Sequence, residues 1–172
     1  KENDFSLKVI HPESEIGVIL MALGFAYAGE KTAVGTSGGG FCLMTEGVSL
    51  SGMAELPVVI VVGQRPGPST GLPTYSSQTD LNFILSAGHG EFARFVVAPG
   101  DAQEAYFWSA QALNFSWKYQ TPAFVLTDKN LGESTFNFDL DSVGEIKEEE
   151  PLVWDGVLPY KRYLDTKDGV SP

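Results

Sequence analysis

One arginine, Arg65, lies in the proline- and glycine-rich stretch GQRPGPSTGLPT (residues 63–74), directly after the apolar run at 57–62. A guanidinium presents a fixed fork of donors that matches a carboxylate. The prolines restrict the loop and so reduce the entropy that is lost on binding. The stretch therefore predicts a preorganised site for an organic acid. The alternatives for Arg65 are packing on an aromatic ring or bridging two subunits.

Two carboxylates, Glu13 and Glu15, stand where a helix should begin after Pro12. Acidic residues interact favourably with the positive end of a helix, so capping and solvation are the ordinary explanation for such a pair. The following residues, 16–26, are largely apolar, so whichever carboxylate faces them would lose water. A partly desolvated carboxyl suits proton exchange with a ring nitrogen. These residues alone do not choose between the two glutamates.

The segment from Thr36 to Gly40, TSGGG, lies between an expected strand and an expected helix. It offers backbone N–H groups at a helix start, but it lacks the lysine of a P-loop and the spacing of a dinucleotide-binding loop. A tight turn is the simple explanation, and glycines would also let a flat ring approach closely. Cys42 is expected in the core and His89 in a surface turn, and no metal site or catalytic triad is predicted.

The surrounding elements follow from hydrophobic patterning. Four runs rich in β-branched residues indicate strands covered on both faces, at 32–34, 58–62, 95–97 and 123–126. Three stretches have helical spacing of their apolar residues, 15–28, 41–53 and 101–119. The alternation predicts an α/β fold, a three-layer sandwich with a mostly parallel sheet. Ligands of such sheets bind at the carboxyl ends of the strands, so the chemistry should lie on the loops that follow them.

Composition narrows the class of function. The formal net charge of −11 over 172 residues disfavours a nucleic-acid partner, because phosphate binding depends on lysine and arginine. A single cysteine cannot supply the four thiolates of an iron–sulfur cluster. No apolar stretch is long enough to cross a bilayer, and no signal peptide is recognised. We therefore expect a cytoplasmic location and no membrane role.

The regular pattern ends at Leu131. We expect residues 1–131 to form one domain and residues 132–172 to form an extended acidic connector toward a following domain. The run from Glu148 to Glu150 is expected at a solvated surface rather than in a metal site.

Together these motifs resemble the alpha subunit of 2-oxoacid:ferredoxin oxidoreductases, in its thiamine-diphosphate pyrimidine-binding domain. The segments that carry the resemblance are ESEIGVILMALGFAYAG, TSGGGFCLMTEGVSLSGM, GQRPGPSTGLPT, AGHGEFARFVVAPGD and KYQTPAFVLTD. The resemblance implies a pyrimidine-domain fold without its first βα unit. It implies thiamine diphosphate shared with a beta subunit, which would hold Mg²⁺ and an iron–sulfur cluster outside this chain. The implied reaction, in pyruvate or 2-oxoglutarate metabolism, converts a 2-oxoacid and coenzyme A to acyl-CoA, with electrons passed to ferredoxin.

The same resemblance implies residue roles. Glu15, rather than Glu13, would hydrogen-bond the pyrimidine N1′ and promote the imino tautomer of the cofactor. Ser37, Gly38 and Phe41 would touch the pyrimidine end.

On the substrate side, the resemblance places Arg65 at the substrate carboxylate and Thr74 beside the substrate chain. The chain alone is expected to be inactive. Two other hypotheses remain open: a non-catalytic assembly domain of the same fold, and a component of a thiamine-dependent decarboxylase that does not oxidise. Uptake of thiamine diphosphate by the assembled complex would argue against the assembly domain. An iron–sulfur partner would argue against the non-oxidative decarboxylase.

Overall fold

The computed structural model describes residues 7–157 and 159–172. Within them a sheet has the strand order β1-β2-β4-β3, and each neighbouring pair is parallel. The strands are β1 (Ala33–Ser37), β2 (Val58–Gln64), β3 (Phe95–Val97) and β4 (Pro122–Asp128). The parallel sheet confirms the predicted α/β class.

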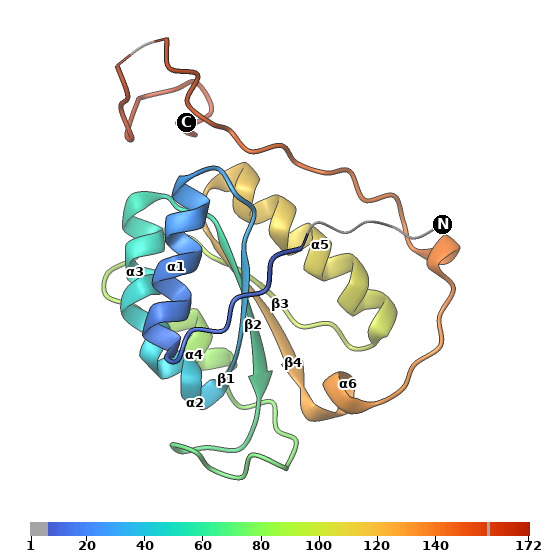
Figure 1. The fold of residues 1–172 in the computed structure, drawn as a ribbon. Coiled ribbons are helices and arrows are strands. Elements are labelled where there is room, and N and C mark those ends of the chain that lie inside the picture. The colour runs from blue at the N-terminus through green and yellow to red at the C-terminus, as the bar shows by residue number, and fades with distance from the viewer. Residues whose placement is uncertain (1–6, 158) are drawn as a thin grey trace.

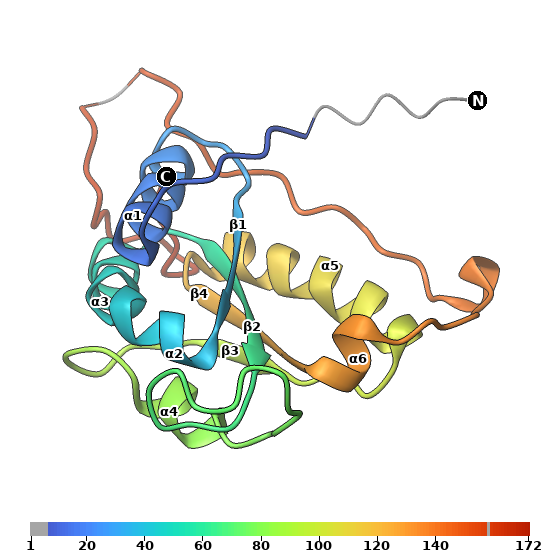
Figure 2. The ribbon, with the colours of Figure 1, turned by 60° about the horizontal axis from the view of Figure 1, so that its bottom comes forward.

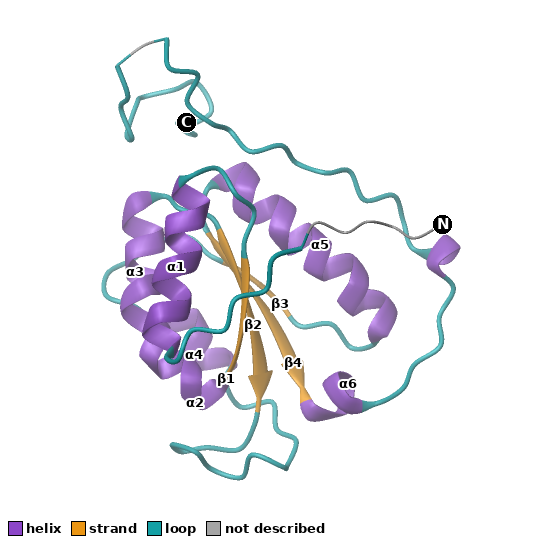
Figure 3. Ribbon diagram, in the orientation of Figure 1, coloured by secondary structure: helices purple, strands orange, loops and turns teal. Residues whose placement is uncertain are grey.

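Helices cover both faces of this sheet (Figures 1 and 3). One face carries α1 (Glu15–Tyr27), the four-residue α2 (Gly38–Phe41), α3 (Thr45–Ala54) and α4 (Leu81–Ser86). The other face carries α5 (Ala102–Tyr119), and α6 (Lys129–Glu133) follows the end of β4. These are the three layers that the sequence predicts.

The core divides into two clusters because successive strand residues point to opposite faces. On β2, Val58, Ile60 and Val62 pack beneath α1, α3 and α4, with Phe41 and Phe124 in the same cluster. The intervening residues of β2 face α5, where Val59 belongs to a smaller buried cluster. Both faces of β2 are therefore buried, which is why its sequence is continuously apolar.

Three local features differ from the sequence-based expectation. The helix expected over 41–53 begins at Gly38, and a 3₁₀ turn, Cys42–Met44, separates α2 from α3. The short α4 and α6 were not predicted, because one or two turns carry too little periodicity. Local capping starts α6, where Asp128 Oδ1 accepts a hydrogen bond from the Leu131 N–H at 2.9 Å. The structure therefore adds short elements at the carboxyl edge of the sheet.

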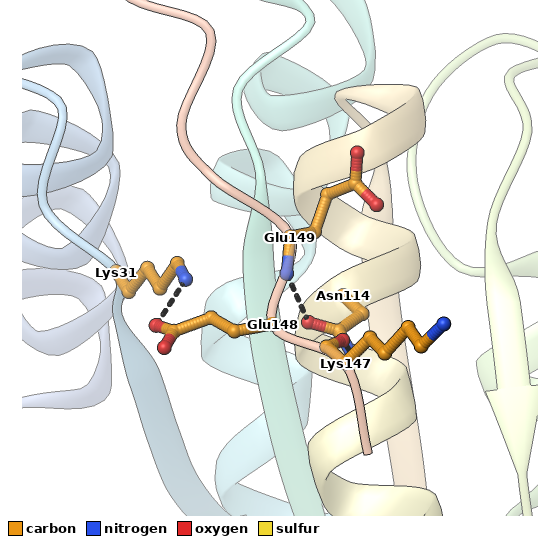
Figure 4. A network of polar contacts seen from close by, with 5 residues as sticks. All are labelled: Lys31, Asn114, Lys147, Glu148 and Glu149. Carbon is orange, nitrogen blue, oxygen red and sulfur yellow. Dashed lines mark hydrogen bonds and ion pairs between the residues drawn. The ribbon is translucent and has the colours of Figure 1, made fainter. Parts of the chain in front are cut away.

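The chain beyond α6 is tied back onto the domain. Lys31, just before β1, pairs with Glu148 at 2.6 Å (Figure 4). Asn114 on α5 donates to the carbonyl of Lys147 at 2.7 Å and accepts from the N–H of Glu149 at 2.9 Å. The Glu148 side chain is still 72% exposed, so the acidic run is both solvated and anchored.

A second anchor, Arg162, lies at the amino end of the sheet. Its Nε donates to the carbonyl of Ala54 at 2.6 Å, and its Nη2 donates to the carbonyl of Glu55 and, at 3.4 Å, to Gln120 Oε1. Glu55 and Gln120 are the residues that end α3 and α5. A cation at two helix carboxyl ends meets the negative ends of both dipoles. No helix within the described residues is long and apolar enough to cross a membrane.

Candidate active site

The carboxyl end of β1 leads straight into α2, whose first residues are three glycines. The hydroxyl of Ser37 caps this short helix by accepting the N–H of Gly40 at 3.3 Å. A Cβ placed on Gly40 would lie 2.4 Å from Thr36 Oγ1 and 2.9 Å from Glu15 Oε1. Position 40 therefore has no room for a side chain, and the Glu15 carboxylate lies directly against the backbone of α2.

Glu15 is the first residue of α1, behind the capping residue Ser14. Its side chain is half-buried, whereas Glu13 is exposed. Glu15 and Ser37 border a hollow of about 750 Å³ between the segment at 7–14, α1 and β1. Among the two glutamates, Glu15 is thus the one held against the glycine turn.

Arg65 approaches the same turn from the loop that follows β2. A Cβ placed on Gly39 would lie 3.3 Å from Arg65 Nη2 and 3.1 Å from the carbonyl oxygen of Ser69. Figure 2 shows this loop beside α2 and α4 at the carboxyl edge of the sheet. Arg65 and Glu15 therefore meet adjacent residues of α2, Gly39 and Gly40, although Arg65 does not border the hollow described above.

The loop itself is closed by backbone contacts. The N–H of Leu72 donates to the carbonyl of Pro66 at 3.1 Å. Gly71 has φ +55°, and a Cβ there would lie 1.7 Å from the Pro66 oxygen, so this turn requires glycine. Gly67 and Pro68 are joined by a cis peptide bond. Thr74, further along the loop, is exposed.

Sequence patterning missed one residue of this region, Asp80. A Cβ placed on Gly38 would lie 2.4 Å from Asp80 Oδ2, so the carboxylate presses against the first residue of α2. Burial raises the pKa of Asp80, while the backbone N–H and the positive charge of Arg65 act in the opposite direction with smaller effect. The Asp80 N–H also donates to Gln64 Oε1 at 3.2 Å. From the sequence, an aspartate just before LNFILS indicates only a helix cap.

Other candidates lie elsewhere. Phe41 is fully buried, and its ring packs at centroid distances of 5.1 Å from Phe83 and 5.5 Å from Phe124. With no exposed surface, the Phe41 ring packs the core under α2. Cys42 is exposed, which corrects the expectation of a small core residue, because the 3₁₀ turn rotates it outward. His89 is exposed.

Metal ligands are not grouped in the described part of the chain. No cluster of three or more histidine, cysteine, aspartate or glutamate side chains suited to a metal ion occurs among residues 7–157 and 159–172. The charged groups that lie at the α2 turn are the carboxylates of Glu15 and Asp80 and the guanidinium of Arg65.

Comparison with known proteins places this arrangement in a family. Residues 2–164 match the family described as "Pyruvate flavodoxin/ferredoxin oxidoreductase, thiamine diphosphate-binding". The chain is 45% identical over 170 residues to the 2-oxoacid:ferredoxin oxidoreductase 1 subunit alpha of Sulfurisphaera tokodaii, covering 97% of this chain and 27% of that protein. It is 38% identical to the 2-oxoglutarate synthase subunit KorA of Methanocaldococcus jannaschii, covering 87% of this chain and 43% of that protein.

A solved structure has the same fold. The 2-oxoglutarate:ferredoxin oxidoreductase of Magnetococcus marinus, solved with 2-oxoglutarate, coenzyme A and succinyl-CoA bound, superposes with a TM-score of 0.85 at 36% identity. The match covers 96% of this chain and 29% of that one. The chain thus spans under a third of this structure, with nearly all of its own residues aligned.

Proposed function

Because the chain belongs to the thiamine diphosphate-binding family of pyruvate flavodoxin/ferredoxin oxidoreductases, we propose that it is the alpha-subunit part of a 2-oxoacid:ferredoxin oxidoreductase. In this reaction a 2-oxoacid and coenzyme A yield acyl-CoA, carbon dioxide and one proton. Two electrons leave one at a time through an iron–sulfur cluster to ferredoxin. The relatives named as alpha subunits support this assignment.

The residues at α2 fit the pyrimidine end of thiamine diphosphate. The three glycines let the side chains of Glu15, Arg65 and Asp80 lie close against the α2 backbone, where Cβ atoms would meet them. A flat ring that contacts Glu15 would need the same close approach to this backbone. We assign Glu15, Ser37 and Gly38 to the cofactor side of the site; Phe41 supports α2 from below through its packing.

Each residue has a distinct role in the proposal. Thiamine diphosphate supplies, when bound, the electron sink that decarboxylation requires. The half-buried Glu15 carboxylate would exchange a proton with the pyrimidine N1′, and partial removal of water strengthens that hydrogen bond. Arg65 would bind the substrate carboxylate through its paired donors, and Thr74 would lie beside the substrate chain once a partner covers the exposed loop.

The observation that carries the proposal is the meeting of Glu15 and Arg65 at adjacent glycines of α2. The glutamate to which we assign proton exchange and the arginine to which we assign the substrate carboxylate thus lie at one turn at the carboxyl edge of a parallel sheet, where ligands of this fold class bind.

The remaining parts are assigned to other subunits. A chain with one cysteine cannot ligate an iron–sulfur cluster by itself, so we place that cluster in a beta subunit, together with the Mg²⁺ that would hold the diphosphate. The proposal is a hetero-oligomer that works in the cytoplasm with soluble ferredoxin.

The test is cofactor analysis and dye reduction by the complete alpha–beta complex, with a panel of 2-oxoacids and coenzyme A. Reduction that needs both substrates is expected. A complex that takes up no thiamine diphosphate would instead identify an assembly domain. Carbon dioxide release without dye reduction would identify a non-oxidative decarboxylase.

A further inference from the structure

Asp80 occupies the N-cap position of α4, yet its side chain makes no capping hydrogen bond to that helix. Four other α-helices among the described residues are capped by the side chains of Ser14, Ser37, Asp101 and Asp128. Aspartate is among the strongest capping residues, so leaving the helix uncapped is costly. The Asp80 carboxylate is therefore held away from its own helix by tertiary contacts.

Those contacts all lie at the start of the Arg65 loop. The carboxylate presses against Gly38, where no Cβ fits, and it faces the backbone N–H and the positive charge of Arg65. In return, the Asp80 N–H donates to Gln64 Oε1 at 3.2 Å. The Gln64 side chain is thus hydrogen-bonded to the backbone of residue 80 at the base of the intervening loop, and the Asp80 carboxylate lies near Arg65.

Two polar atoms in this pair of residues are buried without a hydrogen-bond partner among the described residues: Arg65 Nε, a donor, and Asp80 Oδ2, an acceptor. Buried polar groups are nearly always paired, so two unpaired atoms in this pair of residues indicate a functional constraint. The ion pairs among the described residues do not include one between Arg65 and Asp80, so the Arg65 guanidinium is not committed to this carboxylate.

We propose that Asp80 is a positioning residue for Arg65: its carboxylate fixes the backbone and guanidinium of Arg65 over α2, so that the guanidinium meets the 2-oxoacid carboxylate in one orientation. The inference rests on the proposed function, from which it takes the identity of the substrate. It adds a residue that the sequence analysis did not single out.

The charged Asp80 carboxylate lowers the stability of the folded chain. Because burial raises the pKa of Asp80, the charged form is less favourable in the folded chain than in the unfolded one. A group with a raised folded pKa stabilises the fold below its unfolded pKa and loses that contribution as the pH rises through the folded pKa. Near neutral pH, replacement of Asp80 by the isosteric, uncharged asparagine should therefore leave the fold at least as stable.

The first test is Asp80→Asn in the complete alpha–beta complex. We expect KM for the 2-oxoacid to rise about tenfold, the effect of weakening one charge-assisted contact, with kcat within about twofold. The thermal unfolding midpoint should be unchanged or higher. Asp101→Asn is the matched control, because it also removes a charge from an N-cap aspartate, one that caps its own helix α5, and it should leave KM unchanged. An unchanged KM in Asp80→Asn overturns the inference.

A double-mutant cycle separates positioning from packing. If Asp80 acts through Arg65, Asp80→Asn should add nothing to the rise in KM already caused by Arg65→Ala. A merely structural role predicts that the two effects multiply, and that outcome also contradicts the proposal.

Hydrogen exchange provides a readout that needs no turnover. In the complex without substrate, amides of the peptide 64–72 should exchange about tenfold faster in Asp80→Asn than in the wild type or in Asp101→Asn. If the wild-type complex oxidises no 2-oxoacid, the proposed function fails, and the exchange comparison still decides whether Asp80 holds Arg65. Equal exchange in all three proteins would refute that hold.

Discussion

Two arginines at opposite ends of the sheet are used in contrasting ways. At the amino end, Arg162 donates to the carbonyls of Ala54, Glu55 and Ser171 and to the side chain of Gln120. At the carboxyl end, Arg65 is half-buried and its Nε has no partner among the described residues. The Arg162 guanidinium thus donates to acceptors of the protein itself, whereas Arg65 Nε donates to no acceptor among the described residues.

The difference shows how burial and hydrogen bonding together distinguish structural from ligand-binding cations. Both side chains give up water, and both lie near helix termini. The carbonyls of Ala54 and Glu55 at the end of α3, which need donors, accept hydrogen bonds from Arg162, and so does the side chain of Gln120 after α5. Arg65 Nε has no such acceptor among the described residues. The nearby Asp80 carboxylate contributes a negative charge but accepts no hydrogen bond from this atom.

The largest expected effect concerns the acid that shares the turn with Arg65. Glu15→Gln in the complete complex should lower kcat by about 10²- to 10⁴-fold, because glutamine cannot exchange a proton. The midpoint of thermal unfolding should change little. Glu13→Gln is the control and should keep wild-type rates. Equal rates in both variants would remove Glu15 from the catalytic site.

The next effect sharpens the comparison directly. Arg65→Ala should raise KM for the 2-oxoacid by about 10- to 100-fold, since a charged hydrogen-bonding partner of the carboxylate is lost. Arg65→Lys should recover only part of this loss, because a lysine lacks the paired donors. Steady-state kinetics with the 2-oxoacid as the varied substrate would measure both effects. An unaltered KM in Arg65→Ala would mean that Arg65, like Arg162, does not bind the substrate.

The converse prediction applies to Arg162. Arg162→Ala should lower the free energy of unfolding by about 2–4 kcal/mol, since it leaves several carbonyl groups unpaired. The KM for the 2-oxoacid should stay at the wild-type value. Denaturant unfolding of the complex, followed beside the kinetics, measures both quantities. A raised KM without any loss of stability would contradict a purely structural role for Arg162.

The smallest effect is expected at the surface ion pair. Lys31 lowers the pKa of Glu148 through a hydrogen bond and its charge. A lowered folded pKa means that the pair stabilises the fold above the unfolded pKa of Glu148, and that this contribution disappears as the pH falls through the folded value. Glu148→Gln should therefore lower the unfolding midpoint slightly at neutral pH and low salt. The difference from the wild type should vanish in high salt or in acid.

Much of the fold followed from local patterns. The apolar runs of β2 and β4 predicted buried parallel strands, because both faces of each strand are covered. The helix over α5 followed from the helical spacing of its apolar residues. The short α4 was missed because its six residues carry too little periodicity.

The candidate site was less accessible to sequence reasoning. Patterning singled out Arg65 and the pair of Glu13 and Glu15 by their unusual surroundings, the family resemblance chose Glu15, and the assigned roles remain predictions. It could not place Phe41 in the core or turn Cys42 outward, because both depend on where the 3₁₀ turn begins. Nor could it connect Asp80 with Arg65, whose chain positions are separated by a loop.

The sequence by itself determined the layered α/β architecture and the glycine turn after β1, since periodicity, propensity and the absence of side chains act over a few neighbouring residues. Only the tertiary structure decided which charged groups are paired. Arg162 donates to carbonyl groups more than a hundred residues away along the chain. The Asp80 side chain does not cap its own helix and lies instead against the backbone of Gly38. Such choices arise from packing, which brings together groups that no local pattern links.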